Sequence, residues 1–118
     1  MDENIRLAQE KFGKLIESEY ARIERMKEDT EVTDFSKLDK IIVGVLPGDG
    51  IGPIIMKEAL RVLRYLMALE IESGKVEIRE IPGMTIAARA AQNESLPPKV
   101  LAEVKRGNVL LKGPRVAP

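Results

Sequence analysis

IIVGVLPGDGIGP, at residues 41–53, is the stretch of sequence that decides the fold. Its first six residues are mostly branched aliphatics, which suit a strand buried on both faces, and Gly48, Gly50 and Gly52 follow. Glycine permits backbone angles and close approaches that a Cβ would block, and Pro53 is tolerated in the first turn of a helix. The stretch therefore predicts a buried strand, a tight loop and a helix that begins near Pro53.

The glycine loop has two interpretations. Such a loop places free N–H groups at a helix N-terminus, beside the carboxyl end of a strand, where ligands of open α/β sheets bind. However, Pro53 holds the position of the third glycine in the dinucleotide fingerprint G-x-G-x-x-G, so the loop is not that motif. Alternatively, the glycines only make a sharp connection between strand and helix. Asp49, the acidic residue of the loop, is expected to accept N–H bonds within its own turn.

After the loop, the sequence continues to alternate between helical and strand patterns. Residues 75–81 alternate charged and aliphatic side chains and predict a strand exposed on one face, and residues 109–111 predict a third, buried strand. Helices are predicted at 84–91 and 98–105. The helix that begins near Pro53 should end near Gly74 and pack a broad apolar face on the sheet. That face is made of Ile54, Ile55, Ala59, Val62, Leu63, Leu66 and Met67. The fold class is α/β with a βαβ unit.

An amphipathic helix is predicted at residues 3–28, with apolar side chains at Ile5, Ala8, Phe12, Leu15, Ile16, Ile23 and Met26. This stripe could bind a partner or dock on its own domain, and we favour docking because the heptad pattern is too short to impose a supercoil. Polar residues then form a linker up to Lys40. The predicted organisation is an N-terminal amphipathic helical extension and linker at 1–40, and an incomplete α/β domain at 41–118.

Composition excludes several classes of function. The 19 basic and 19 acidic residues cancel and aromatic side chains are scarce, which argues against nucleic-acid binding. The absence of cysteine and histidine excludes disulfides, thiol catalysis and the commonest general base. No apolar run is long enough for a signal peptide or a membrane span, so we expect a cytoplasmic protein without a membrane partner.

Three motifs carry a resemblance to a known family. The run Val45–Pro53, the pair Leu96-Pro97 and the run Lys112-Gly113-Pro114 resemble, in order and interval, the N-terminal part of the β-decarboxylating dehydrogenases. That family contains isocitrate, homoisocitrate and 3-isopropylmalate dehydrogenases. The resemblance covers residues 40–118 and implies the N-terminal βαβ-type portion of the isocitrate/isopropylmalate dehydrogenase fold. Lys112-Gly113-Pro114 favours the isocitrate branch.

The resemblance also implies an activity and its cofactors. Family members oxidise the 2-hydroxyl of a malate-type substrate with NAD or NADP and then decarboxylate it with Mg²⁺ or Mn²⁺, as homodimers. By analogy, Leu46 and Ile51 are expected to lie towards the adenosine half of the cofactor. The loop at residues 112–117 is expected to approach the nicotinamide and the substrate. Lys112 is then the best candidate for a ligand contact, through its ammonium group.

The family's catalytic and metal-binding residues belong to segments that would follow Pro118. We therefore predict no catalytic residue and no metal ligand within residues 1–118, and no activity or substrate binding from this segment alone. This chain also departs from the family pattern at Ile54, Val116 and Ala117. One alternative is a short non-catalytic paralogue that binds or regulates a complete dehydrogenase through its helical stripe. A third hypothesis is a mononucleotide-binding domain built on the glycine loop.

Overall fold

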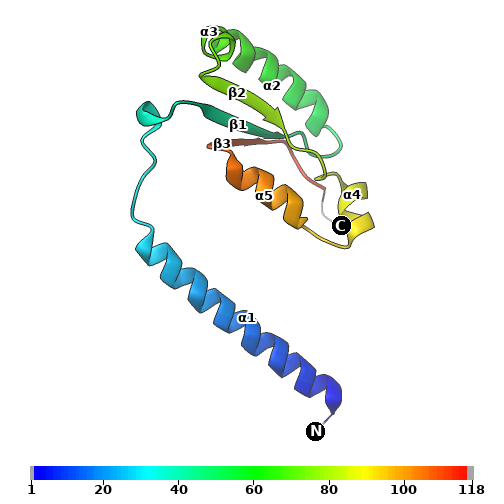
Figure 1. Cartoon of the computed structure of the whole chain (residues 1–118). Coiled ribbons are helices and arrows are strands. Elements are labelled where there is room, and N and C mark those ends of the chain that lie inside the picture. Colours follow the sequence, from blue (N-terminus) through cyan, green and yellow to red (C-terminus); the bar gives the residue numbers. More distant parts are fainter. Residues whose placement is uncertain (1, 117–118) are drawn as a thin grey trace. The chain divides into compact units, whose positions relative to one another are not determined.

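A computed structural model describes residues 2–116 (Figure 1). The chain divides into two compact units between Asp34 and Phe35, and the boundary predicted from the sequence lies a few residues later, at Lys40. The first unit contains helix α1, Glu3–Glu28. The second unit contains the sheet, and it begins with a single turn of 3-10 helix at Phe35–Lys37.

Helix α1 is held by local interactions. The carboxylate of Asp2 accepts a hydrogen bond from the N–H of Asn4 and caps the first turn. Exposed ion pairs one turn apart follow along the helix, joining Glu3 to Arg6, Glu10 to Lys14, Glu19 to Arg22 and Glu24 to Lys27. None of the helix residues is buried, so the structure gives the apolar stripe no packing partner within residues 2–34.

The second unit is an α/β structure, as predicted, with three parallel strands in the order β2-β1-β3. Strand β1, Ile41–Leu46, lies in the middle, between β2, Val76–Glu80, and β3, Val109–Lys112. Val43 aligns with Ile78 on one side and with Val109 on the other. The central position of β1 explains its apolar sequence, because a strand flanked by strands and covered on both faces is largely withdrawn from water, and residues 43–46 of β1 are buried.

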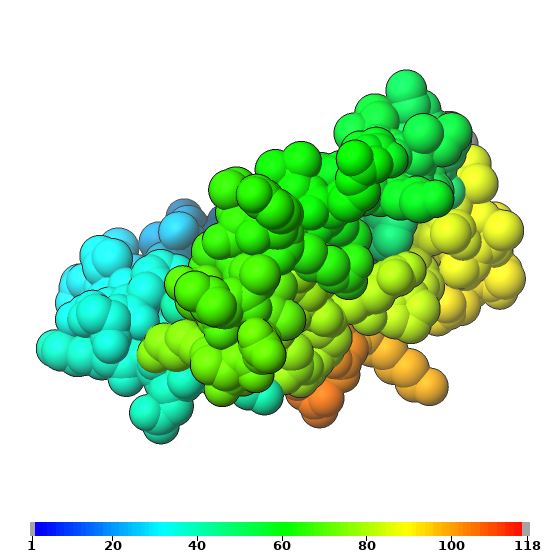
Figure 2. Space-filling model, turned by 90° about the horizontal axis from the view of Figure 1, so that it is seen from above, coloured from blue at the N-terminus to red at the C-terminus, as the bar shows by residue number. Residues whose placement is uncertain are grey.

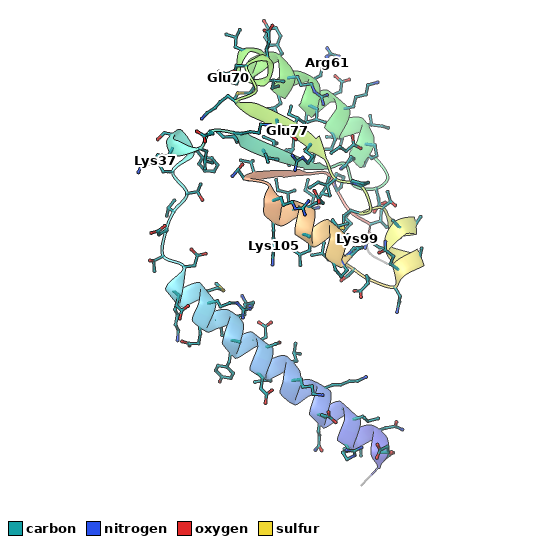
Figure 3. The ribbon with its side chains drawn as sticks, viewed as in Figure 1. Lys37, Arg61, Glu70, Glu77, Lys99 and Lys105 are labelled. Carbon is teal, nitrogen blue, oxygen red and sulfur yellow. The ribbon has the colours of Figure 1, made fainter. Side chains whose placement is uncertain are left out.

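Helices cover both faces of this sheet (Figure 1). Helix α2, Gly52–Leu66, and the short α3, Ala68–Glu72, lie on one face, and α5, Pro98–Arg106, lies on the other. Helix α4, Ile86–Gln92, lies beyond the carboxyl ends of the strands (Figure 1). Lys99 and Lys105 project from the side of α5 that faces away from the sheet (Figure 3).

The core consists of two apolar clusters, one for each face of β1. On the α2 side, Val43 and Val45 pack with Met56 and Val76. On the α5 side, Leu46 packs with Ile81, Met84 and Val100. Side chains alternate between the two faces of a strand, so one short strand contributes to both clusters.

Two sequence predictions about burial are wrong. Strand β3, which lies at an edge of the sheet, was expected to be buried, but Val109 is 44% exposed and Leu110 is 43% exposed. The broad apolar face of α2 was expected to pack on the sheet, but only a narrower row does so. That row consists of Met56, Leu60, Leu63 and, just after the helix, Met67. Three strands make a sheet too narrow to cover the rest, so Ile54, Ile55, Val62 and Leu66 are exposed.

The predicted long helix between β1 and β2 is interrupted at Met67, where the backbone leaves helical geometry and α2 gives way to α3. Gly74, with φ of +79°, then ends the helical segment as predicted. Among residues 2–116, no helix is both long enough and apolar enough to span a bilayer.

Candidate functional site

The candidate site lies at the carboxyl ends of the strands. Because all three strands are parallel, the segments that follow them converge at the same edge of the sheet (Figure 1). These segments are the glycine loop after β1, the Ile81–Thr85 segment after β2, and residues 113–116 after β3. Open α/β sheets bind their ligands at this edge.

The first and third of these loops touch backbone to backbone. The N–H of Gly113 donates to the carbonyl of Leu46 at 2.7 Å, and the N–H of Asp49 donates to the carbonyl of Pro114 at 2.9 Å. A Cβ at Gly48 would collide with the Pro114 carbonyl, and one at Gly113 would collide with the Pro47 carbonyl. These glycines therefore allow two backbones to approach each other, which favours the architectural interpretation of the loop.

Asp49 and Arg89 form a buried ion pair at the centre of this edge. Arg89 Nη2 lies 3.3 Å from Asp49 Oδ2, and the two side chains are 3% and 7% exposed respectively. Asp49 Oδ1 accepts a hydrogen bond from the N–H of Ile86 at 2.8 Å, and Oδ2 accepts one from the N–H of Val116 at 3.4 Å. The Asp49 carboxylate thus connects the loop after β1 to the start of α4 and to the segment after β3.

This environment lowers the pKa of Asp49. The N–H of Ile86 contributes most, followed by the N–H of Val116 and the guanidinium of Arg89, and together they outweigh the effect of burial. The prediction that Asp49 accepts bonds within its own turn is wrong for the side chain, whose partners come from elsewhere in the chain. Only its backbone carbonyl accepts within the turn, from the N–H of Gly52 at 2.8 Å. A carboxylate whose pKa is lowered and whose oxygens already accept hydrogen bonds from three donors is a weak general base.

A cleft of about 490 Å³ lies beside these loops, between α2 and the segment after β2. In Figure 2, α2 appears in green beside the yellow-green segment that follows β2. The walls of the cleft are mainly apolar, with contributions from Met56, Leu60 and Met84, and the charged groups of the cleft come from Lys57 and Glu80. Apolar walls with a few polar groups are typical of sites for small organic ligands. Within residues 2–116 no three His, Cys, Asp or Glu side chains cluster as a metal site would require.

The three predicted cofactor contacts occupy different environments. Leu46 is 3% exposed and belongs to the core cluster on the α5 side. Ile51 is 62% exposed at the N-cap of α2. Lys112 is exposed at the end of β3, where its Nζ donates to the carbonyl of Gly113 at 2.8 Å. None of the three lines the cleft, and Ala117, which the predicted ligand loop included, lies outside the described residues.

Sequence reasoning missed Arg89. The residue interrupts the alanine-rich run of α4, and no acidic residue stands three or four positions away on either side. A charged residue without a possible partner on its own helix is a signal of a long-range partner. Here that partner is Asp49, forty residues earlier in the chain.

Comparisons with known proteins point to one kind of enzyme. No protein-family model matches the chain. It is 38% identical over 71 residues to a 3-isopropylmalate dehydrogenase of Novosphingobium aromaticivorans and 40% identical over 72 residues to one of Bordetella avium. It is also 34% identical over 71 residues to a 3-isopropylmalate dehydrogenase of Buchnera aphidicola.

Each of these alignments covers 60% of this chain but only 18–19% of the relative. The chain therefore matches less than a fifth of the length of these curated relatives. Over that stretch its similarity to 3-isopropylmalate dehydrogenases supports the resemblance to the β-decarboxylating dehydrogenase family.

Proposed function

We propose that the α/β unit is part of a nicotinamide-dependent dehydrogenase that oxidises and decarboxylates a 2-hydroxy acid of the malate type. The identity of 34–40% to 3-isopropylmalate dehydrogenases carries this proposal. The convergence of three loops at the carboxyl edge of a parallel sheet supports it, because nucleotide cofactors bind at such edges. NAD or NADP would accept the hydride when bound.

Two residues of this edge fit a role in holding that cofactor or the substrate. Ile51 offers an exposed aliphatic surface at the start of α2, suited to the apolar face of an adenosine. Lys112 is an exposed residue whose ammonium, among residues 2–116, donates one hydrogen bond, to the Gly113 carbonyl, which leaves two donors for a carboxylate or phosphate. Leu46, buried below them, would support the loop from the core rather than through its own exposed surface.

We assign no metal ligand and no catalytic residue within this chain. Within residues 2–116 no three-ligand group suits Mg²⁺ or Mn²⁺, and Asp49 is committed to Ile86, Val116 and Arg89. We therefore propose that residues 1–118 by themselves do not turn over substrate. The activity of the whole enzyme would require further residues.

The preferred substrate is 3-isopropylmalate, because the three relatives named above carry that name. Isocitrate is the second candidate, because the run Lys112-Gly113-Pro114 after β3 resembles the isocitrate branch. Lys112 would provide an additional positive charge, which suits the third carboxylate of isocitrate better than an isopropyl group.

The test starts from the native protein. Antibodies against residues 35–116 would capture it from its source, and mass spectrometry would give its length. The captured protein would then be assayed with 3-isopropylmalate and isocitrate, each with NAD or NADP and Mg²⁺. The 118-residue chain, purified separately, is the control and should be inactive.

Turnover of one substrate by a longer captured protein would support the proposal. A captured protein of 118 residues, inactive but bound to a complete dehydrogenase, would instead support the regulatory paralogue. Turnover by the 118-residue chain itself would contradict the assignment of catalysis to other residues.

A further inference from the structure

We propose that Arg89 is a positioning residue, which anchors the segment Gly113–Val116 and thereby orients the exposed Lys112 ammonium towards an anionic ligand. The ligand part of this inference rests on the proposed function. The anchoring part rests only on the contacts of Arg89 and can be tested without any activity.

Arg89 and Asp49 together hold the far end of the segment. Arg89 Nη2 donates to the carbonyl of Val116 at 2.6 Å, while Asp49 Oδ2 accepts from the N–H of the same residue at 3.4 Å. Both backbone polar groups of Val116 are therefore bound by one ion pair. The two side chains of that pair are almost entirely withdrawn from water, whereas Val116 itself is 47% exposed, so the pair holds the edge of an exposed segment from its buried side.

The near end of the segment is held by backbone bonds. Gly113 donates to Leu46, and Pro114 accepts from Asp49, so the segment is fixed directly after Lys112 as well as at Val116. Lys112 is the last residue of β3 and its own Nζ bonds to the Gly113 carbonyl. The position of its ammonium thus depends on the path of the segment that follows.

Stability alone does not explain an arginine at this position. A buried ion pair gives little net stability, since desolvation of the charges offsets their attraction. Arg89 Nε is in addition buried without a hydrogen-bond partner among the described residues, which is unfavourable. A methionine could fill much of the same volume in α4, but it could not bind the Val116 carbonyl. What the arginine adds is the hydrogen bond to Val116, which fixes the position of the segment after β3.

The first experiment measures amide hydrogen exchange by NMR in the 118-residue chain, for the wild type and for Arg89→Met, Arg89→Lys and Arg115→Met. Arg115 is the matched control, since it lies within the segment, is exposed, and among the described residues makes a single long bond, 3.4 Å to the Ser95 carbonyl. Arg89→Met should raise the exchange rates of the Gly113 and Val116 amides by about tenfold or more and leave the Val45 amide unchanged. Arg89→Lys should give a smaller increase, and Arg115→Met no increase.

Exchange of Gly113 and Val116 within about twofold of wild type in Arg89→Met would overturn the inference. Unfolding of both Arg89 variants, seen by circular dichroism, would overturn it too, because Arg89 would then support the whole domain. If only one of the two Arg89 variants folds, the exchange rates of the Gly113 and Val116 amides in that variant decide whether Arg89 anchors the segment.

The second experiment uses the active native-length dehydrogenase. Arg89→Met should raise the KM for the hydroxy acid by about tenfold more than Lys105→Met does, with a smaller effect on kcat, because Lys105 is an exposed residue of α5 outside the predicted ligand loop. Equal KM values in these two variants would overturn the ligand part of the inference. If no active enzyme is found, the proposed function and the ligand part fail together, while the exchange experiment still decides whether Arg89 anchors the segment.

Discussion

The guanidinium of Arg89 lies 3.3 Å from the carboxylate of Asp49, although forty residues of sequence separate them. Through this pair, helix α4 is connected to the glycine loop after β1 and to the segment after β3. The pair therefore joins the start of α4 and two loops into one connected edge of the sheet. Its consequences for stability and for ligand binding can be measured.

Acidification should destabilise the protein through Asp49. The pKa of Asp49 is lowered in the folded state, mainly by the N–H of Ile86, so its contribution to stability is complete above about pH 4 and is lost as the pH falls further. Urea unfolding between pH 7 and pH 2.5 should show this loss in the wild type. Asp49→Asn should be less stable at pH 7 and should approach the wild type at low pH.

Glu77→Gln is the control for that prediction. The pKa of Glu77 is also lowered, first by Lys40 and then by Arg79, but its carboxylate is a third exposed. The contribution of ionised Glu77 to the free energy of unfolding should therefore be smaller than that of Asp49. Added salt should decrease the contribution of Glu77 but not that of Asp49. If the free energies of unfolding of the wild type and Asp49→Asn change with pH in parallel, the acid-induced loss of stability does not come from Asp49.

Gly48→Ala should be much more destabilising than Gly50→Ala. Both glycines have positive φ, +84° and +56°, so alanine at either costs about 1–2 kcal/mol in backbone strain. Only at Gly48 would the added Cβ also meet backbone, the carbonyl of Pro114, which we expect to cost about 1–3 kcal/mol more. Chemical denaturation of the two variants measures the difference, and equal stabilities would show that the two loops do not approach as described.

The amides of α1 should exchange faster than those of β1. The helix buries none of its residues and is supported by exposed ion pairs and an N-cap, whereas Val43 and Val45 lie in the core. Hydrogen exchange followed by mass spectrometry should separate residues 3–28 from residues 41–46. Protection of α1 as strong as that of β1 would mean that its apolar stripe is covered by a partner or a second copy.

Lys112→Met should weaken substrate binding without weakening the fold. The side chain is exposed, so the loss of its charge should change the melting temperature little, while the KM of the active enzyme for its hydroxy acid rises about tenfold. Lys105→Met, a change at an exposed lysine of α5, is the matched control (Figure 3). Identical kinetics in these two variants would remove Lys112 from the proposed site.

Most elements of the α/β unit could be predicted because their signals are local. The aliphatic run of β1, the glycines after it and the alternation in β2 depend only on neighbouring residues. The exposure of Val109 and the partial exposure of α2 could not be predicted in this way. They depend on which strand lies at the edge of the sheet and on how wide the sheet is.

The candidate site was predictable in location but not in detail. A glycine loop between a strand and a helix marks the carboxyl edge of a sheet, and the sequence contains that loop at residues 47–53. The sequence alone thus determined the fold class, the buried strand at residues 41–46 and the position of the glycine loop that follows it. Only the tertiary structure decided that Asp49 pairs with Arg89 and Val116 and that the first and third loops touch, because residues far apart in sequence meet only when the strands take the order β2-β1-β3.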